Sequence, residues 1–424
     1  MSHSWNMIQT DQLRINADRL LEDFDIICSI GATDSGGIHR PALSPEDLEA
    51  RAWFANLVEQ EGFALLDDEA GNLSGVWRSD NPHAQTLMIG SHLDTPPNGG
   101  SYDGTVGVLA GLEVIRTLRD ADLPLPLHIE VMNFTDAQGT WLSLLGSRSL
   151  AGQLALEKLK EARGGDATFR AALNRAGITL DKLTQAQRPA NSLAAFLELH
   201  VEQGDVLEQA QLPIGVVEGI VGRHTSLVTF HGQTGHSGTT AAPKRRDALQ
   251  GAAVFITEAH RLVAERFPDG TVNVADLSVE PAIFNVIPNR AAALLEWRHP
   301  DADQLELMRV ALLDLAQQCG KRYRLNTQFT DKEHMPAAVM DATMIALTQQ
   351  VCDQLALPTR HMLSYAGHDA QPMAALVPSL MIFIPSVGGI SLSPNEYSRW
   401  EDVVNGANVL LQTTIAVAQR FSAV

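Results

Sequence analysis

Histidine and aspartate side chains gather in the segment GSHLDTPPNGGSYDG, which contains His92, Asp94 and Asp103. On an extended chain, residues two apart share a face, so Asp94 can hold the His92 imidazole in one tautomer. The Pro/Gly-rich turn that follows can bring Asp103 back toward the same place. Imidazole and carboxylate are the usual ligands of divalent metals, so the segment predicts a metal site. The alternative is that Asp103 only forms the turn.

A further histidine, His200, ends the predicted strand in ELHVEQG. A single histidine at a strand end is usually an ordinary packed residue. Glu198 and Glu202 share its strand face, however, and the three side chains together look like a site.

The elements that must position these residues follow from the apolar spacing. The stretches QTLMIGSHLD and LPLHIEVMNFTD read as strands, and the helix-like GTVGVLAGLEVIRTLRDA lies between them. This βαβ pattern predicts parallel strands, whose carboxyl ends collect ligands. His92, Asp94 and Asp136 all lie just after or at such strand ends. Residues 11–61 are predicted to form a helical N-terminal layer.

After residue 214 the pattern changes to strand, helix, strand, strand, helix, strand, which is the ferredoxin-like split unit. From residue 334 alternating helices and strands resume. We therefore predict an α/β catalytic domain formed by 1–214 and 334–424, interrupted by an inserted α+β (βαββαβ) domain over 215–333.

Composition excludes several classes of function. The chain has 424 residues, with 50 acidic against 31 basic side chains and a net charge of −19, and no basic block that would follow a phosphate backbone, so nucleic acid is not expected as a partner. No apolar run approaches the roughly 18 residues that span a bilayer. The N-terminus lacks an export signal and the three cysteines form no CxxC pair, so we expect reduced thiols and a cytoplasmic location.

The motifs, taken in order, resemble those of one known family. GSHLDTPPNGGSYDG, FTDAQG, ELHVEQGDVLE, GHSGTT, FNVIPN, AGHDA and PSVGGISLSP together resemble the amidase/hydantoinase/carbamoylase branch of the M20 metallopeptidases. The resemblance runs through nearly the whole chain. It implies a zinc-exopeptidase-like catalytic domain and an inserted dimerisation or lid domain, and an amidohydrolase that acts on non-peptide C–N bonds.

The resemblance also implies a pair of divalent metals, usually zinc or manganese, bridged by Asp103. The ligands of one metal match His92 and His200 and are intact. The second metal would take a glutamate and a histidine, but Gln138 and Leu392 stand at these positions. An amide and an isobutyl group are poor replacements, so we predict a single-metal centre with one metal per subunit.

The family's general base is also missing. It takes a proton from the attacking water, and its position is Ala137, which cannot accept one. The nearest remaining carboxylate is Asp136, which either holds its loop or serves as a substitute base.

The residues that bind the substrate in the family all have matching residues in this sequence. An arginine can bind a carboxylate through two parallel hydrogen bonds, and a histidine can stabilise a developing oxyanion, in this family at the partner subunit's site. The matching residues are Gln203, His236, Asn285, Arg298, Gly388 and Gly389. His368, in AGHDA, is a further family position without an assigned role.

The sequence therefore predicts a metal-dependent amidohydrolase of carbamoylase type, acting on a small N-substituted amino acid or similar carboxylate. The alternatives are a catalytically silent relative that binds a carboxylate, or an enzyme with a changed reaction such as deamination or ring opening. A homodimer through the inserted domain is expected, with no nucleic-acid or membrane partner.

Overall fold

The computed structural model describes residues 10–123 and 125–422. The chain folds into two compact units, which are Met1–Glu218 with Val339–Val424 (unit 1) and Gly219–Ala338 (unit 2). Unit 2 begins and ends a few residues later than the predicted insertion. The reason is local pairing: strand β6 (Ile214–Ile220) hydrogen-bonds along strand β13 (Ser379–Ile384) through Gly215–Val217 and so continues the sheet of unit 1.

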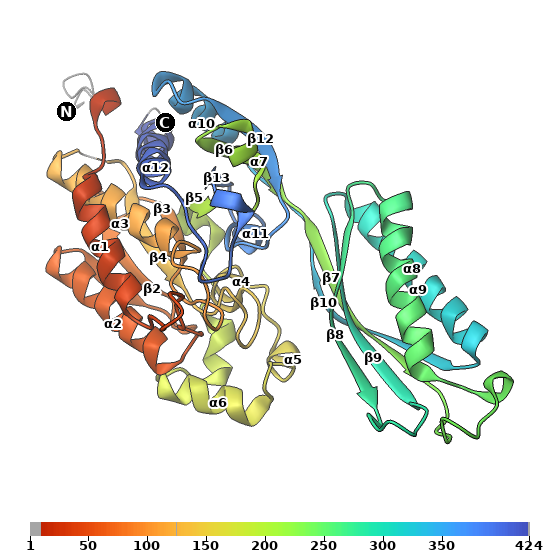
Figure 1. Ribbon diagram of the computed structural model, residues 1–424. Coiled ribbons are helices and arrows are strands. Elements are labelled where there is room, and N and C mark those ends of the chain that lie inside the picture. Colours follow the sequence, from red (N-terminus) through yellow and green to blue (C-terminus); the bar gives the residue numbers. More distant parts are fainter. Residues whose placement is uncertain (1–9, 124, 423–424) are drawn as a thin grey trace. The chain divides into compact units, whose positions relative to one another are not determined.

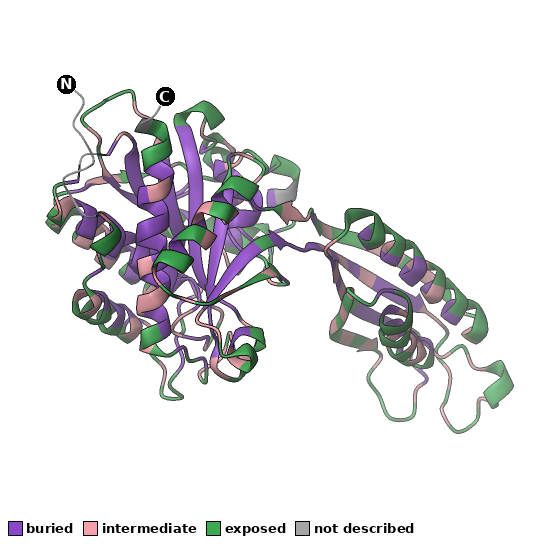
Figure 2. Cartoon of the chain, turned by 90° about the horizontal axis from the view of Figure 1, so that it is seen from above, coloured by how far each residue is buried: buried purple, intermediate pink, exposed green. Residues whose placement is uncertain are grey.

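Unit 1 is built around a mixed sheet whose central strands are parallel, as the βαβ pattern predicted (Figure 1). The strand order is β1-β2-β4-β3-β5-β13-β6-β11, and β12 pairs with β6. The remaining strands are β1 (Ala64–Asp67), β2 (Leu73–Trp77), β3 (Thr86–His92), β4 (His128–Phe134), β5 (Leu193–Val201), β11 (Ala338–Val339) and β12 (Thr359–Ser364). The central strands are buried along their whole length (Figure 2).

Helices cover this sheet. The longer ones are α1 (Ala17–Ser29), α2 (Pro45–Gln60), α3 (Thr105–Asp120), α10 (Ala342–Gln354) and α12 (Trp400–Ser422). Short helices follow the loops, at α4 (Leu145–Leu150), α5 (Leu156–Leu159), α6 (Asp166–Arg175), α7 (Val206–Ala210) and α11 (Ala370–Met373). Among the described residues, no helix combines the length and apolar character needed to cross a bilayer.

Helix α3 lies close against the sheet because it carries glycines on the packed face. A Cβ at Gly107 would meet the Leu199 carbonyl oxygen at 2.4 Å, and one at Gly111 would meet the Val131 side chain at 2.7 Å. Glycine therefore permits the close approach. The turn before α3, which carries Asp103, is held next to the ends of β3 and β5.

Unit 2 is a four-stranded antiparallel sheet with two helices, in the predicted βαββαβ order. Its elements are β7 (Gly222–His231), α8 (Ala248–Arg266), β8 (Thr271–Glu280), β9 (Arg290–His299), α9 (Ala302–Tyr323) and β10 (Asn326–Met335). The strand order is β10-β7-β9-β8, so β8 is an edge strand. Helices α8 and α9 share one apolar core with the sheet.

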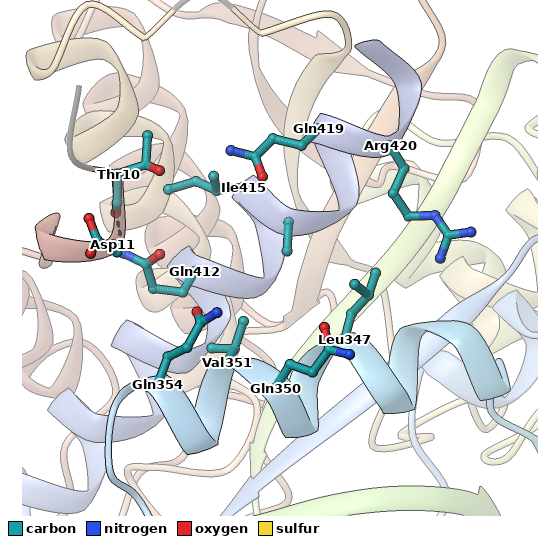
Figure 3. A pocket seen from close by; sticks show the side chains of 11 residues that line it. Thr10, Asp11, Leu347, Gln350, Val351, Gln354, Gln412, Ile415, Gln419 and Arg420 are labelled. Atoms are coloured by element: carbon teal, nitrogen blue, oxygen red, sulfur yellow. Dashed lines mark hydrogen bonds between the residues drawn. The ribbon is translucent and has the colours of Figure 1, made fainter. Parts of the chain in front are cut away.

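A groove of about 450 Å³ lies along α10 and α12 in unit 1 (Figure 3). Glutamine side chains from both helices line much of it, together with Thr10 and Asp11. None of its lining residues is a predicted site residue, so the groove gives no support to the predicted chemistry.

Candidate functional site

Three of the predicted metal ligands converge at the carboxyl ends of neighbouring parallel strands. His92 is the last residue of β3, His200 is the last but one of β5, and Asp103 lies in the turn before α3. The His92 Nε2 atom is 3.2 Å from Asp103 Oδ1, and His200 Nε2 is 3.7 Å from the same oxygen. All three residues are buried. The site thus forms where the parallel topology predicts it.

Both imidazoles are held with Nε2 facing Asp103. His92 Nδ1 lies 2.9 Å from the backbone oxygen of Asp94, and His200 Nδ1 lies 2.9 Å from that of Val201. A carbonyl oxygen only accepts, so each Nδ1 carries a hydrogen and Nε2 is the ring atom that could bind a metal; in the structure His200 Nε2 accepts the Gly104 N–H at 3.3 Å. Such a second hydrogen bond is what orients a metal-binding histidine.

The electrostatics of the cluster favour positive charge. Burial alone would lower the pKa of His92, but the hydrogen bond with Asp103 and the charges of Asp94, Asp103 and Asp369 raise that pKa to about 10. Burial would raise the pKa of Asp103, yet His200 and His92 outweigh it and lower that pKa to about 2. The cluster therefore holds an ionised carboxylate and attracts a cation.

The donor set fits one divalent metal. Ligand atoms at about 2.0–2.1 Å from a tetrahedral zinc are about 3.3 Å apart, close to the distances from Asp103 Oδ1 to the two imidazoles. The ligand atoms of His92, Asp103 and His200 all lie within 4.8 Å of one another. Two imidazoles and one carboxylate would leave a fourth position open for water or substrate.

Amide groups contact both oxygens of Asp103, including Oδ1, which also faces the two imidazoles. Gln138 Nε2 donates to Asp103 Oδ1 at 2.6 Å, and Gln203 Nε2 donates to Oδ2 at 2.5 Å. Ser391 lies next to them, since its hydroxyl is 3.1 Å from Gln203 Nε2 and 3.5 Å from Asp103 Oδ2. Hydrogen-bond donors thus surround both carboxylate oxygens of Asp103.

Glu396 was not predicted, although it organises this face. Its Oε1 accepts the backbone N–H groups of Tyr102 and Asp103, and its Oε2 accepts the Ser391 hydroxyl and the Leu392 N–H. Burial raises the pKa of this carboxyl, and the charge of Asp103 adds to the effect. No sequence signal identified Glu396, because it lies two residues beyond the end of the motif GGISLSP.

The loop of Ala137 and Gln138 is held through its backbone. Both oxygens of Asp94 accept its N–H groups, Oδ1 from Ala137 at 3.2 Å and Oδ2 from Gln138 at 3.1 Å. Asp136 is fully buried with φ of 55°, and its Oδ2 accepts the N–H groups of Trp141 and Leu142. The second oxygen, Oδ1, has no hydrogen-bond partner.

The other substituted position, Leu392, presents an apolar side chain that is 45% exposed on a backbone with φ of 55°. The predicted backbone donors nearby have partners in the structure. Gly388 N–H donates to Glu208 at 2.7 Å, and Gly389 N–H donates to the Ser386 carbonyl at 3.1 Å. Their role toward a ligand stays a prediction.

Within unit 2, the predicted substrate residues occupy opposite ends of the sheet. His236 and Asn285 are neighbours, because the Ser237 N–H donates to the Asn285 carbonyl at 2.9 Å and His236 bridges to Val286. They adjoin the end of β7 and the start of β9. Arg298 lies eight residues after Arg290, the first residue of β9, which corresponds to about 27 Å along an extended strand. Its guanidinium forms an ion pair with Glu296 at 2.8 Å.

An inner polar cluster lies behind His200. The ring centroids of His200 and His368 are 4.4 Å apart. A carboxylate oxygen of Glu198 lies within 4.8 Å of a ring nitrogen of each histidine. Glu198 accepts the Ser91 hydroxyl and the Ala370 N–H, and its pKa is raised by burial and by the charge of Asp369. These contacts place His368, which the sequence left unassigned, beside the candidate metal site.

Comparison with known proteins gives the same family as the motifs. Residues 88–416 match the family model described as Peptidase family M20/M25/M40. An N-carbamoyl-L-amino acid amidohydrolase of Geobacillus stearothermophilus is 34% identical over 96% of this chain and 99% of its own length. A ureidoglycolate hydrolase of Arabidopsis thaliana is 33% identical over 95% of this chain and 86% of its own.

A solved structure agrees with the fold. The amidase of the hydantoinase/carbamoylase family from Burkholderia vietnamiensis superposes with a TM-score of 0.87, at 32% identity, over 96% of this chain and 98% of that one.

An α/β unit with two histidines at strand ends and an aspartate in a neighbouring turn, interrupted by a βαββαβ unit, defines a hydrolase with a candidate metal site. More particularly, the chain belongs to peptidase family M20, and its relatives include amidohydrolases that act on non-peptide C–N bonds.

Proposed function

We propose that the protein is an amidohydrolase that cleaves a carbamoyl or amide C–N bond in a small N-substituted amino acid or similar carboxylate. The observation that carries the proposal is the arrangement of His92, Asp103 and His200, whose ligand atoms converge with both Nε2 atoms facing one carboxylate. The similarity to carbamoyl-amino-acid and ureidoglycolate hydrolases supports the substrate class.

We propose one divalent metal per subunit, zinc or manganese, held by these three residues. Such a metal polarises a carbonyl oxygen and makes water a better nucleophile. The second metal of the family is not expected, because Gln138 and Gln203 donate to Asp103 where it would bind. Leu392 offers no ligand atom there.

The chain's own residues supply the remaining steps. His236 accepts hydrogen bonds at Nδ1, so its Nε2–H group is available to donate to the developing oxyanion. Arg298 binds the substrate carboxylate, with Asn285 adding an amide donor. Asp136 remains the candidate proton acceptor near Ala137, since its Oδ1 has no other partner.

The separation of Arg298 from His236 and Asn285 supports a homodimer. One small substrate cannot span about 27 Å of strand, so the two groups would serve different copies of the site. Edge strand β8 exposes unpaired backbone groups that can pair with a second copy. We also propose a cytoplasmic location, which suits three cysteines without disulfides.

The test is turnover of a panel of N-carbamoyl, N-formyl and N-acyl amino acids and ureido acids by protein loaded separately with zinc, manganese, cobalt or nickel. We expect hydrolysis of at least one carboxylate substrate, and its loss in His92→Asn and His200→Asn. No turnover with any metal would refute the proposal.

The second candidate is a catalytically silent protein that binds a carboxylate. Ala137 and Gln138 favour it, because neither can act as a base or a carboxylate ligand. Thermal stabilisation by the same panel, with no metal bound and no turnover, would establish this alternative.

A further inference from the structure

The backbone of the turn that carries His236 holds the neutral imidazole in one tautomer. The backbone N–H groups of Gly238 and Thr239 lie 3.1 Å and 3.3 Å from His236 Nδ1 and donate to it. The Thr240 N–H donates back to the His236 carbonyl at 3.0 Å. In the neutral ring the hydrogen therefore sits on Nε2, the atom that must donate to an oxyanion.

This turn is exposed, and its side chains pack against little of the core. His236, Gly238 and Thr239 are all exposed, and residues 237 and 240 are only half-buried. An exposed turn of small polar residues opens easily unless other groups hold it. The direction of the His236 ring therefore depends on groups outside the turn.

Arg245 provides that support from the following segment. Its Nε donates to the Thr240 carbonyl at 3.0 Å, and its terminal nitrogen donates to the Ser237 carbonyl. One planar guanidinium thus bridges both ends of the turn. A hydrogen bond from an ionised donor is about twice as strong as a neutral one, and the rigid fork fixes its direction. Among the described residues, no carboxylate lies within ion-pair distance of Arg245 to compete for it.

The backbone of Arg245 is itself fixed to the body of unit 2. Arg324, which follows α9, donates from its guanidinium to the carbonyl oxygens of Pro243 and of Arg245, the latter at 2.9 Å. Arg246 pairs with Gln233 in an isolated bridge, and its Nε donates to the Arg324 carbonyl at 2.8 Å. The support therefore runs from α9 through Arg324 to Arg245 and then to the turn.

We propose that Arg245 is a positioning residue for His236: its guanidinium joins the carbonyl oxygens of Ser237 and Thr240 and so directs the His236 Nε2–H group for the reaction. The inference rests on the proposed function, in which that group stabilises the oxyanion. Arg245 itself contacts neither substrate nor metal in this role.

The test compares Arg245→Ala and Arg245→Lys with Arg261→Ala, a control at an exposed arginine of α8 whose side chain pairs with Glu258 and Glu265. The first readout needs no substrate. In Arg245→Ala, amide hydrogen exchange at residues 237–240 should accelerate while exchange in α8 and β9 stays unchanged, and the ¹⁵N shifts of the His236 ring should show mixed tautomers. Arg245→Lys should restore part of the protection, and Arg261→Ala should match the parent at residues 237–240.

The second readout uses the substrate identified by the panel. We expect kcat to fall about 100-fold in Arg245→Ala with little change in KM, because misplacing one oxyanion donor costs about that much. His236→Ala combined with Arg245→Ala should be no slower than His236→Ala alone, since the arginine acts only through the histidine.

The outcomes separate the two proposals. If the parent protein hydrolyses nothing, the proposed function fails, while hydrogen exchange and the ring shifts still decide whether Arg245 holds the turn. Unchanged exchange in Arg245→Ala would overturn the inference. An additive loss of kcat in the double variant would also overturn it, because Arg245 would then act independently of His236.

Discussion

The replacement Gln138→Glu tests whether the space beside Asp103 is organised for one cation. Gln138 Nε2 donates to Asp103 Oδ1 at 2.6 Å, so a glutamate here places two carboxylates in contact. Two like charges about 4 Å apart repel by about 4 kcal/mol at an effective dielectric constant near 20. Loss of the hydrogen bond leaves a buried acceptor short of a donor, at a further cost of about 1–3 kcal/mol.

The metal-free variant should therefore be about 5–7 kcal/mol less stable than the parent at pH 8. The repulsion raises the pKa of the new carboxyl in the folded state, so the folded protein binds more protons than the unfolded chain there. Stability should then fall as the pH rises. A divalent metal between the two carboxylates should reverse the loss and raise the bound metal toward two per chain.

The assay is urea unfolding of chelator-treated protein at pH 6 and pH 8, with and without zinc or manganese, together with metal analysis. Gln138→Met is the matched control, because it loses the amide donor without adding charge, and it should show no pH-dependent loss. If Gln138→Glu is as stable as Gln138→Met at pH 8 without metal, Asp103 does not face position 138 as described.

Three further outcomes follow from the structure. His92→Asn should abolish metal binding while leaving the fold intact, which metal analysis and circular dichroism would show. Burial lowers the pKa of His224 to about 4, with His334 adding to the effect. The unfolded chain therefore binds the extra proton first, so unit 2 should lose up to about 3 kcal/mol as the pH falls from about 6.5 to 4. His224→Phe, which keeps the ring stacked on Trp297, should remove this pH dependence in urea unfolding. Finally, Leu392→Ala should lower kcat/KM for substrates with large apolar side chains more than for the glycine derivative; equal losses would show that Leu392 does not face the substrate.

The fold was largely predictable because its pattern is local and periodic. The βαβ segment around α3 and the βαββαβ order of unit 2 both follow from apolar spacing, and both are present in the structure. Strands β1, β2, β6 and β12 were not predicted. They are short or partly exposed, and their pairing depends on long-range neighbours such as β4 and β13.

The candidate site was predictable only where a motif identified it. His92, Asp103 and His200 lie at strand ends or turns next to glycines, and they converge as predicted. Glu396 and Arg245 were missed because each acts through backbone groups of distant residues. A carboxylate that accepts N–H groups, or a guanidinium that joins two carbonyl oxygens, has no sequence spacing of its own.

The loop of Ala137 and Gln138 is held through backbone groups. Asp94 accepts both N–H groups of this segment, and Asp136 anchors its continuation through Trp141 and Leu142. A loop fixed through its backbone tolerates new side chains more readily than one fixed by the side chains themselves. Glu at positions 137 and 138 should therefore leave the path of this loop unchanged, and the loss of stability expected for Gln138→Glu comes from the new charge beside Asp103.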